Sequence, residues 1–253
     1  MDRRRQRRRM RRKSRNRLAV VTLAGVAAAV LATAFAMRLL PPDAAGAHAP
    51  QAGANQAQAG GGEAGGDWRL RLASAAHPLP ADFSVETVPA GNRYKQVQFD
   101  KRAAPDLEAL LEACNSEGYQ LMPCSGYRDV AYQTGLFERQ VKQEEDRGAP
   151  EEDARSAAAT VVAEPGTSEH NLGLAVDFGT VDNQKIDESF AQEPVFQWLQ
   201  ENAWKYGFIL RYPQDKESVT GIVYEPWHYR YVGKEAAEQI HSRGVCLEEY
   251  LGK

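Results

Sequence analysis

The chain has 253 residues, and its charge is divided unevenly along them. Residues 1–17 hold eleven of the 31 Lys and Arg residues and one of the 34 Asp and Glu residues, so the rest carries 20 basic and 33 acidic residues, a net charge of −13. An acidic body cannot release counterions from phosphates, which argues against a nucleic-acid-binding protein.

The arginine-rich residues 1–17 precede twenty apolar or small uncharged residues, 18–37. At about 1.5 Å per residue, this stretch is long enough for one membrane span. Because basic residues stay on the cytoplasmic side, we expect residues 1–17 inside the cell, an anchor over 18–37 and the rest of the chain outside. The alternative is a cleaved signal peptide, whose apolar region is usually about 7–15 residues long. Either segment would export the domain that follows.

A linker is expected after the anchor. Residues 41–66 are mainly Ala, Gly, Gln and Pro, with almost no large apolar side chain. Such a segment cannot offset its ordering entropy by burial. We therefore expect a flexible linker over 38–66 and one folded domain over 67–253, which is long enough to bury a core.

Apolar periodicity and helix-breaking residues predict the elements of this domain in chain order. Helices are predicted at 105–117, 130–147, 150–162, 194–206 and 234–243, and strands at 119–123, 174–178, 208–212 and 227–232. The first helix carries Leu107, Leu110 and Leu111 on one stripe and stops before Gly118. Helices and short strands mix without strict alternation, so we expect an α+β fold, a small antiparallel sheet flanked by helices.

Three cysteines lie in this domain, and an exported domain allows disulfides. Cys114 and Cys124 could pair across a predicted helix–strand turn. An odd number leaves at least one thiol unpaired within a monomer. None of the cysteines, Cys246 included, has a metal-type spacing, so burial as small apolar side chains is the default expectation.

Two of the five histidines lie in distinctive surroundings. His170 is on a predicted loop ahead of Asp177, whose neighbours in a predicted strand are apolar. A carboxylate there needs a partner, and a metal ion is one. Glu225 and His228 lie three residues apart around a Pro-Trp pair that prevents a helix.

These residues form a possible metal site. Catalytic zinc takes three N or O ligands and leaves a position for water, and His170, Asp177 and His228 would supply that set. Glu225 then remains as a general base. A His and an Asp at this spacing are common by chance, so the pair by itself leaves a structural ion pair open.

Several separated motifs make the chain similar to a known family. SEHNLGLAVDF at 168–178 and EPWHYRYVG at 225–233, joined by YGFILRYP and VTGIVYEPWH, resemble the VanY-type D-alanyl-D-alanine carboxypeptidases of the LAS metallopeptidases. SGYR at 125–128 matches the substrate-binding segment of that family. The resemblance covers about residues 107–251, and the motifs occur in the family's order.

The resemblance implies a compact zinc-peptidase domain. Its zinc ligands would be His170, Asp177 and His228, and Glu225 would be the catalytic base. The substrate-binding side chains implied by the resemblance are Ser125, Arg128, Gln133 and Ser168. Arg128 would contact the free carboxylate of the substrate or, as a catalytic residue, the developing oxyanion. A guanidinium can hold a carboxylate bidentately, which suits an enzyme that recognises a chain end, although a lone Arg128 could equally form a surface ion pair. The same resemblance suggests that Arg211 and Tyr212, ahead of Pro213, lie in a loop that could border the cleft.

The expected activity is removal of the C-terminal D-amino acid from peptidoglycan stem peptides. The enzyme would be monomeric, anchored in the bacterial membrane by one helix and without a nucleic-acid partner. The alternatives are an LD-carboxypeptidase that acts on tetrapeptide stems, a D,D-dipeptidase, an inactive zinc-containing wall-binding module, and a structural protein in which Asp177 forms a salt bridge without zinc. Glu225 argues against the binding module, because such a module needs no base.

Overall fold

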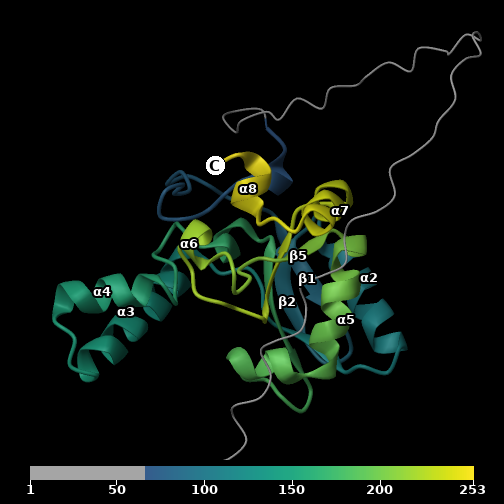
Figure 1. The fold of residues 1–253 in the computed structure, drawn as a ribbon, viewed down its shortest axis with the longest axis horizontal. Helices are drawn as coiled ribbons and strands as arrows, with labels where there is room; N and C mark the ends of the chain where they lie inside the picture. The colour runs from purple at the N-terminus through teal and green to yellow at the C-terminus, as the bar shows by residue number, and fades with distance from the viewer. Residues whose placement is uncertain (1–65) are drawn as a thin grey trace, which may run out of the picture. The chain divides into compact units, whose positions relative to one another are not determined.

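The computed structural model describes residues 66–253, so the predicted cytoplasmic segment, the anchor and almost all of the linker lie outside the described residues. Within residues 66–253, no helix is long and apolar enough to cross a membrane. This part contains two antiparallel sheets and several helices, which confirms the α+β fold (Figure 1).

A four-stranded antiparallel sheet forms the centre of the domain. Its strand order is β3-β4-β6-β5. The strands are β3 (Leu121–Ser125), β4 (Ala175–Thr180), β6 (His228–Tyr231) and β5 (Phe208–Leu210). In the register, Asp177 of β4 lies opposite Ser125 on one side and His228 on the other. All six residues of β4 are buried, so the sheet places Asp177 in the interior between two polar residues.

A separate two-stranded sheet is formed by β1 (Thr87–Gly91) and β2 (Gln96–Asp100), and the sequence patterns did not predict it. Its strands lack the apolar alternation of a half-buried strand, because β1 contains Pro89 and β2 exposes two glutamines. β2 contacts the end of β3, where Tyr127 N donates to Gln98 O at 2.7 Å. The expected single sheet is therefore two.

The predicted helices are present with small differences at their ends. The α-helices of the described residues are α2 (Ala104–Ser116), α3 (Val130–Asp146), α4 (Glu151–Ala159), α5 (Pro194–Asn202), α6 (Glu217–Thr220), α7 (Lys234–Arg243) and α8 (Leu247–Leu251). The short 3-10 turns are η1 (Trp68–Leu70), η2 (Glu169–Leu172), η3 (Glu188–Gln192) and η4 (Ala203–Tyr206). The predicted helix at 194–206 is α5 continued by η4, and it ends at Gly207, whose φ of 87° suits glycine.

The helices bury three groups of apolar side chains. α2 and α5 pack with the central sheet in the main core, and α7 covers a second cluster with Ile209 and Leu247. α3 and α4 lie side by side, extend away from the sheets and share a small core of their own (Figure 1). This last pair is thus attached to the domain mainly through its ends.

All three cysteines are free thiols, so Cys114 and Cys124 do not pair. Cys114 and Cys246 are buried, as expected for small apolar side chains, and Cys124 is half-buried. Burial raises the pKa of the Cys114 thiol to about 12, which keeps it protonated.

Candidate metal centre

His170 is held by the short turn η2, which precedes β4. The hydroxyl of Ser168 caps this turn and accepts from His170 N at 3.3 Å, and Gly173 ends it with a φ of 72°. Nδ1 of His170 lies 2.6 Å from the carbonyl oxygen of Gly126 and donates to it. Nε2 therefore carries the lone pair, and it lies 3.3 Å from Asp177 Oδ2.

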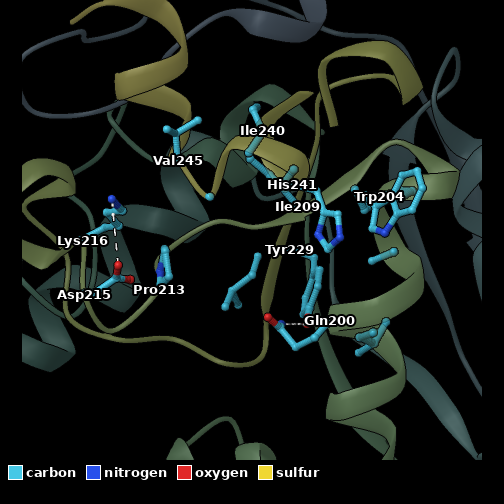
Figure 2. Close-up of a pocket in the computed structure, with 15 residues that line it drawn as sticks. Gln200, Trp204, Ile209, Pro213, Asp215, Lys216, Tyr229, Ile240, His241 and Val245 are labelled. Atoms are coloured by element: carbon cyan, nitrogen blue, oxygen red, sulfur yellow. Dashed lines mark hydrogen bonds and ion pairs between the residues drawn. The ribbon is translucent and has the colours of Figure 1, made fainter. Parts of the chain in front are cut away.

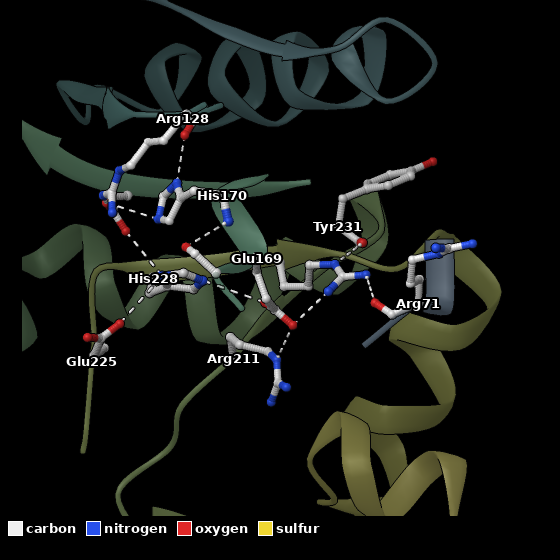
Figure 3. Close-up of polar contacts among 12 residues, drawn as sticks. Arg71, Arg128, Glu169, His170, Arg211, Glu225, His228 and Tyr231 are labelled. Carbon is white, nitrogen blue, oxygen red and sulfur yellow. Dashed lines mark hydrogen bonds and ion pairs between the residues drawn. The ribbon is translucent and has the colours of Figure 1, made fainter. Parts of the chain in front are cut away.

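The turn η2 and two strands of the central sheet bring the three predicted ligands together. Figure 3 shows the two imidazoles, His170 and His228, close to each other. Asp177 and His228 are direct partners across β4 and β6, and His228 Nδ1 lies 3.2 Å from Asp177 Oδ1. One ligand atom from each of His170, Asp177 and His228 lies within 4.8 Å of the others. All three side chains are buried. Residues from a turn and two strands thus converge on one point.

The donor atoms at this point fit a zinc ion. Asp177 Oδ1 is buried and has no hydrogen-bond partner among residues 66–253. A buried oxygen without a partner is costly unless a cation or a donor satisfies it. Two imidazole nitrogens and one carboxylate oxygen are the kind of set that catalytic zinc sites use.

Glu225 faces the same centre from the segment before β6. Its Oε2 lies 3.4 Å from His228 Nδ1, and only 7% of the residue is exposed. The backbone turns tightly here, because His228 N donates to Glu225 O at 3.1 Å. Burial raises the pKa of the Glu225 carboxyl to about 8. A carboxyl group therefore lies next to the three ligand atoms, and a cation bound there would favour its ionised form.

Burial and neighbouring charges shift the pKa of each of the three candidate ligands. Burial disfavours the carboxylate of Asp177, yet His170 and Arg128 hold its pKa well below the usual range. Burial also disfavours a charged His228, but the nearby carboxylates of Asp177 and Glu169 outweigh it and raise the pKa of His228 to about 9, so a metal ion would displace a proton from this ring. Burial and nearby Arg128 lower the pKa of His170 to about 4, so its imidazole is neutral and Nε2 can bind a metal ion.

Arg128 lies beside the centre, with 17% of its side chain exposed. Its Nη2 donates to Asp177 Oδ2 at 2.6 Å, and its Nε donates to the hydroxyl of Ser125 at 2.9 Å. Ser125 therefore orients the guanidinium. Arg128 is the more exposed member of this pair of charges.

The other two predicted substrate contacts lie deeper in the domain. Gln133 is 1% exposed on α3, and its Nε2 donates to the backbone oxygen of Ala163 at 2.7 Å. Ser168 is also buried and caps the turn that carries His170. In this structure both side chains contact backbone atoms.

A buried carboxylate that the motifs did not single out lies behind the centre. Glu169 Oε1 accepts from Arg211 Nε at 2.8 Å and from Arg230 Nη1 at 2.6 Å (Figure 3). Its Oε2 faces His228 Nε2 at 3.7 Å. Arg211 is 1% exposed and its side chain points to Glu169, while the ring of the next residue, Tyr212, lies 4.9 Å from that of His228. The sequence held one sign of this buried carboxylate. Arg211 and Arg230 are each flanked by apolar or aromatic residues in a predicted strand, so each needs an acidic partner if it is buried.

A pocket of about 280 Å³ lies between α5, β5 and α7 (Figure 2). Trp204, Gln200, Tyr229 and His241 are among its lining residues, and none of the predicted site residues is. Tyr229 follows His228 along β6, and side chains alternate between the faces of a strand. The pocket therefore lies away from the metal centre and does not belong to it.

Comparisons with known proteins agree with this geometry. The family model described as VanY, D-alanyl-D-alanine carboxypeptidase, matches residues 96–234. A D-alanyl-D-alanine carboxypeptidase of Enterococcus faecalis is 42% identical over 185 residues, which cover 73% of this chain and 66% of that protein. The chain thus spans just under two thirds of that relative's length.

Two solved structures share the fold. One is a vancomycin-resistance D,D-pentapeptidase VanY from a VanB-type cassette in complex with Zn(II), with 40% identity, a TM-score of 0.65 and coverage of 73% of this chain and 99% of that one. The other is VanYB in complex with D-alanine-D-alanine, with 40% identity, a TM-score of 0.66 and coverage of 74% and 99%. Because the matched family segment spans more than half of the sequence and contains every ligand of the candidate metal centre, this chain belongs to the VanY D-alanyl-D-alanine carboxypeptidase family.

Proposed function

We propose that this protein is a zinc-dependent D-alanyl-D-alanine carboxypeptidase, which removes the C-terminal D-amino acid from peptidoglycan stem peptides. The observation that carries the proposal is the convergence of His170, Asp177 and His228 beside the carboxylate of Glu225. A family relative solved with D-alanine-D-alanine supports the substrate class.

The chemistry is hydrolysis of the last peptide bond. A zinc ion held by His170, Asp177 and His228 would act as a Lewis acid. It would lower the pKa of a water molecule, so that the water can lose a proton and attack near neutral pH. Glu225, 3.4 Å from His228 Nδ1, takes the proton of the attacking water and passes it to the leaving amine. This assignment uses the one carboxylate at the centre that is neither a ligand nor bound by two arginines.

Arg128 is proposed as the substrate-binding cation. Its guanidinium is partly exposed at the edge of the centre and is oriented by Ser125. It can donate to the free carboxylate of the stem peptide or to the oxygen that becomes negative during attack. Either contact favours a peptide that ends one residue beyond the cleaved bond.

The test is mass spectrometry of defined muropeptides after incubation with the purified full-length protein. We expect loss of one terminal D-alanine from pentapeptide stems, no loss in the presence of a chelator, and recovery when zinc is added back. Cleavage of tetrapeptide stems alone would instead identify an LD-carboxypeptidase, and release of a dipeptide would identify a D,D-dipeptidase. Zinc binding without any cleavage would replace the proposal with a wall-binding module.

We also propose that residues 18–37 anchor a monomeric enzyme in the membrane, with residues 67–253 outside the cytoplasm. The support is the position of the basic residues 1–17 directly before a stretch long enough to span a bilayer. Protease added to spheroplasts should digest the domain and leave a membrane-bound N-terminal fragment. A protected domain, or a domain found only in the soluble exported fraction, would contradict the anchor.

A further inference from the structure

Glu169 is a buried carboxylate with two arginine partners. Its side chain has no solvent exposure, and the same is almost true of Arg211 and Arg230, which donate to its Oε1 (Figure 3). A buried charge of this kind is tolerated only when it is paired and hydrogen-bonded. Oε1 is therefore fully engaged, whereas Oε2 points elsewhere.

The direction of Oε2 links Glu169 to the metal centre. Oε2 lies 3.7 Å from Nε2 of His228. Both atoms are buried, and neither has a hydrogen-bond partner among residues 66–253. Leaving a buried polar atom unpaired is costly, and an approach of a few tenths of an ångström would let each of these two atoms satisfy the other. The opposite ring nitrogen, Nδ1, is the one that faces Asp177.

We propose that Glu169 is a positioning residue, which accepts the Nε2–H of His228 and so presents the lone pair of Nδ1 to the metal. The inference rests on the zinc site of the proposed function. In a neutral imidazole only one nitrogen is protonated, and the hydrogen bond made by one nitrogen decides which of them is free to bind a metal. His170 is fixed in the same way by the carbonyl of Gly126, through its other nitrogen.

The surroundings hold Glu169 rigidly enough for this task. Arg211 also donates to Glu248 of α8 at 2.8 Å, and Arg230 donates to the backbone oxygens of Arg69 and Arg71, both at 2.8 Å. The carboxylate is thus fastened to the C-terminal helix and to the segment that begins the domain. Because Glu169 precedes His170 in η2, one short turn sets the position of both imidazoles.

A purely structural role predicts something different. Two arginines and two glutamates form the buried group, and their charges balance. If Glu169 only neutralised the arginines, Glu248 would be its equivalent, since it pairs with Arg211 and is 8% exposed. Only Glu169 reaches His228, so a comparison of the two glutamates separates the two roles.

The experiment compares Glu169→Gln with Glu248→Gln in the full-length protein. Glutamine at 169 keeps an oxygen for the arginines but directs an NH₂ group at His228 Nε2, which favours the wrong tautomer. We expect zinc affinity, measured by competition with a chromogenic chelator, to fall about 10- to 100-fold. Glu248→Gln should reduce thermal stability but leave zinc affinity unchanged. Equal losses of zinc affinity in the two variants would overturn the proposal.

A spectroscopic measurement does not depend on the variants folding. In ¹⁵N-histidine spectra of the wild-type zinc-loaded protein, His228 should be protonated at Nε2, and His170 at Nδ1. Protonation of His228 at Nδ1 instead would overturn the proposal whatever the variants show. Neither zinc affinity nor the tautomer requires turnover. A protein that binds zinc as expected but cleaves no muropeptide would therefore contradict the proposed function and leave this inference standing.

Discussion

At the scale of single residues, two buried carboxylates of the metal centre are balanced by residues from distant segments. Asp177 meets Arg128 from the segment after β3 and His228 from β6, and Glu169 meets Arg211 and Arg230. Burial makes every one of these charges expensive unless its partner stays in place. The geometry of the centre is therefore coupled to the correct formation of the whole sheet.

Glu225 provides the sharpest test at this scale. Glu225→Gln keeps the size of the side chain but removes the base, so we expect kcat for D-alanine release to fall by about 10²- to 10⁴-fold. Zinc content, measured by elemental analysis, should stay at the wild-type level, because Glu225 is not among the three proposed ligands. His228→Ala is the matched variant, and it should lose the metal as well as the activity. Substantial turnover by Glu225→Gln would reject the role of this carboxylate.

The sequence predicted the converging ligands because Asp177 stands among apolar residues and because the surrounding motifs resemble a known family. The same reasoning, applied to Arg211 and Arg230, would have predicted a buried carboxylate partner for them. It would not have identified Glu169, because the three residues come together only when the turn η2 packs behind β6. Contacts between distant segments cannot be read from local patterns.

At the scale of elements, apolar periodicity in the sequence predicted the longer helices. The weak apolar pattern of β1 and β2 did not predict the first hairpin. α7 has the predicted bounds, because Gly244 ends the helix directly after its apolar stripe. β1 and β2 pair with each other and contact the end of β3, so their stability comes from tertiary contacts rather than from alternating apolar residues. That hairpin still matters for the site, because it packs against Gly126.

Gly126 joins the hairpin to the metal centre. A Cβ at this position would lie 2.4 Å from the carbonyl oxygen of Gln98, whereas Gly126 O accepts from His170 Nδ1. Gly126→Ala should therefore cost about 1–3 kcal/mol of unfolding free energy in urea titrations and should weaken zinc binding. Gly135→Ala, in the middle of α3 with the flexible end of Arg139 3.4 Å away, is the control and should add about 0.5–1 kcal/mol. Equal behaviour of the two variants would contradict this account.

The pair α3 and α4 should unfold separately from the sheet. Phe137 is fully buried in the small core of this pair, and α3 and α4 contact each other far more than any other element. Phe137→Ala should destabilise the pair by about 3–5 kcal/mol and speed amide hydrogen exchange throughout both helices. Amides of β4 and β6 should keep their protection in the same exchange experiment. Faster exchange in the strands would show that the pair and the sheet form one cooperative unit.

At the scale of the whole molecule, the segment at the start of the described residues contacts β6, the strand that carries His228. Trp68 stacks on Tyr231, with ring centroids 6.2 Å apart, and the guanidinium of Arg102 lies over the Trp68 ring at 3.6 Å. Arg230 donates to the backbone oxygens of Arg69 and Arg71. Residues 68–71, just after the predicted boundary near residue 67, thus contact the domain.

Two truncated chains test that boundary. A chain that starts at residue 67 keeps both carbonyl partners of Arg230, so its melting temperature and zinc affinity should equal those of the full-length protein. A chain that starts at residue 73 leaves the buried guanidinium without them, and each hydrogen bond to a charged group contributes about 1.5–3 kcal/mol. Because Arg230 also holds Glu169 behind His228, the shorter chain should lose zinc affinity together with thermal stability. Equal melting temperatures for the two chains would mean that residues 67–72 are part of the linker rather than of the catalytic domain.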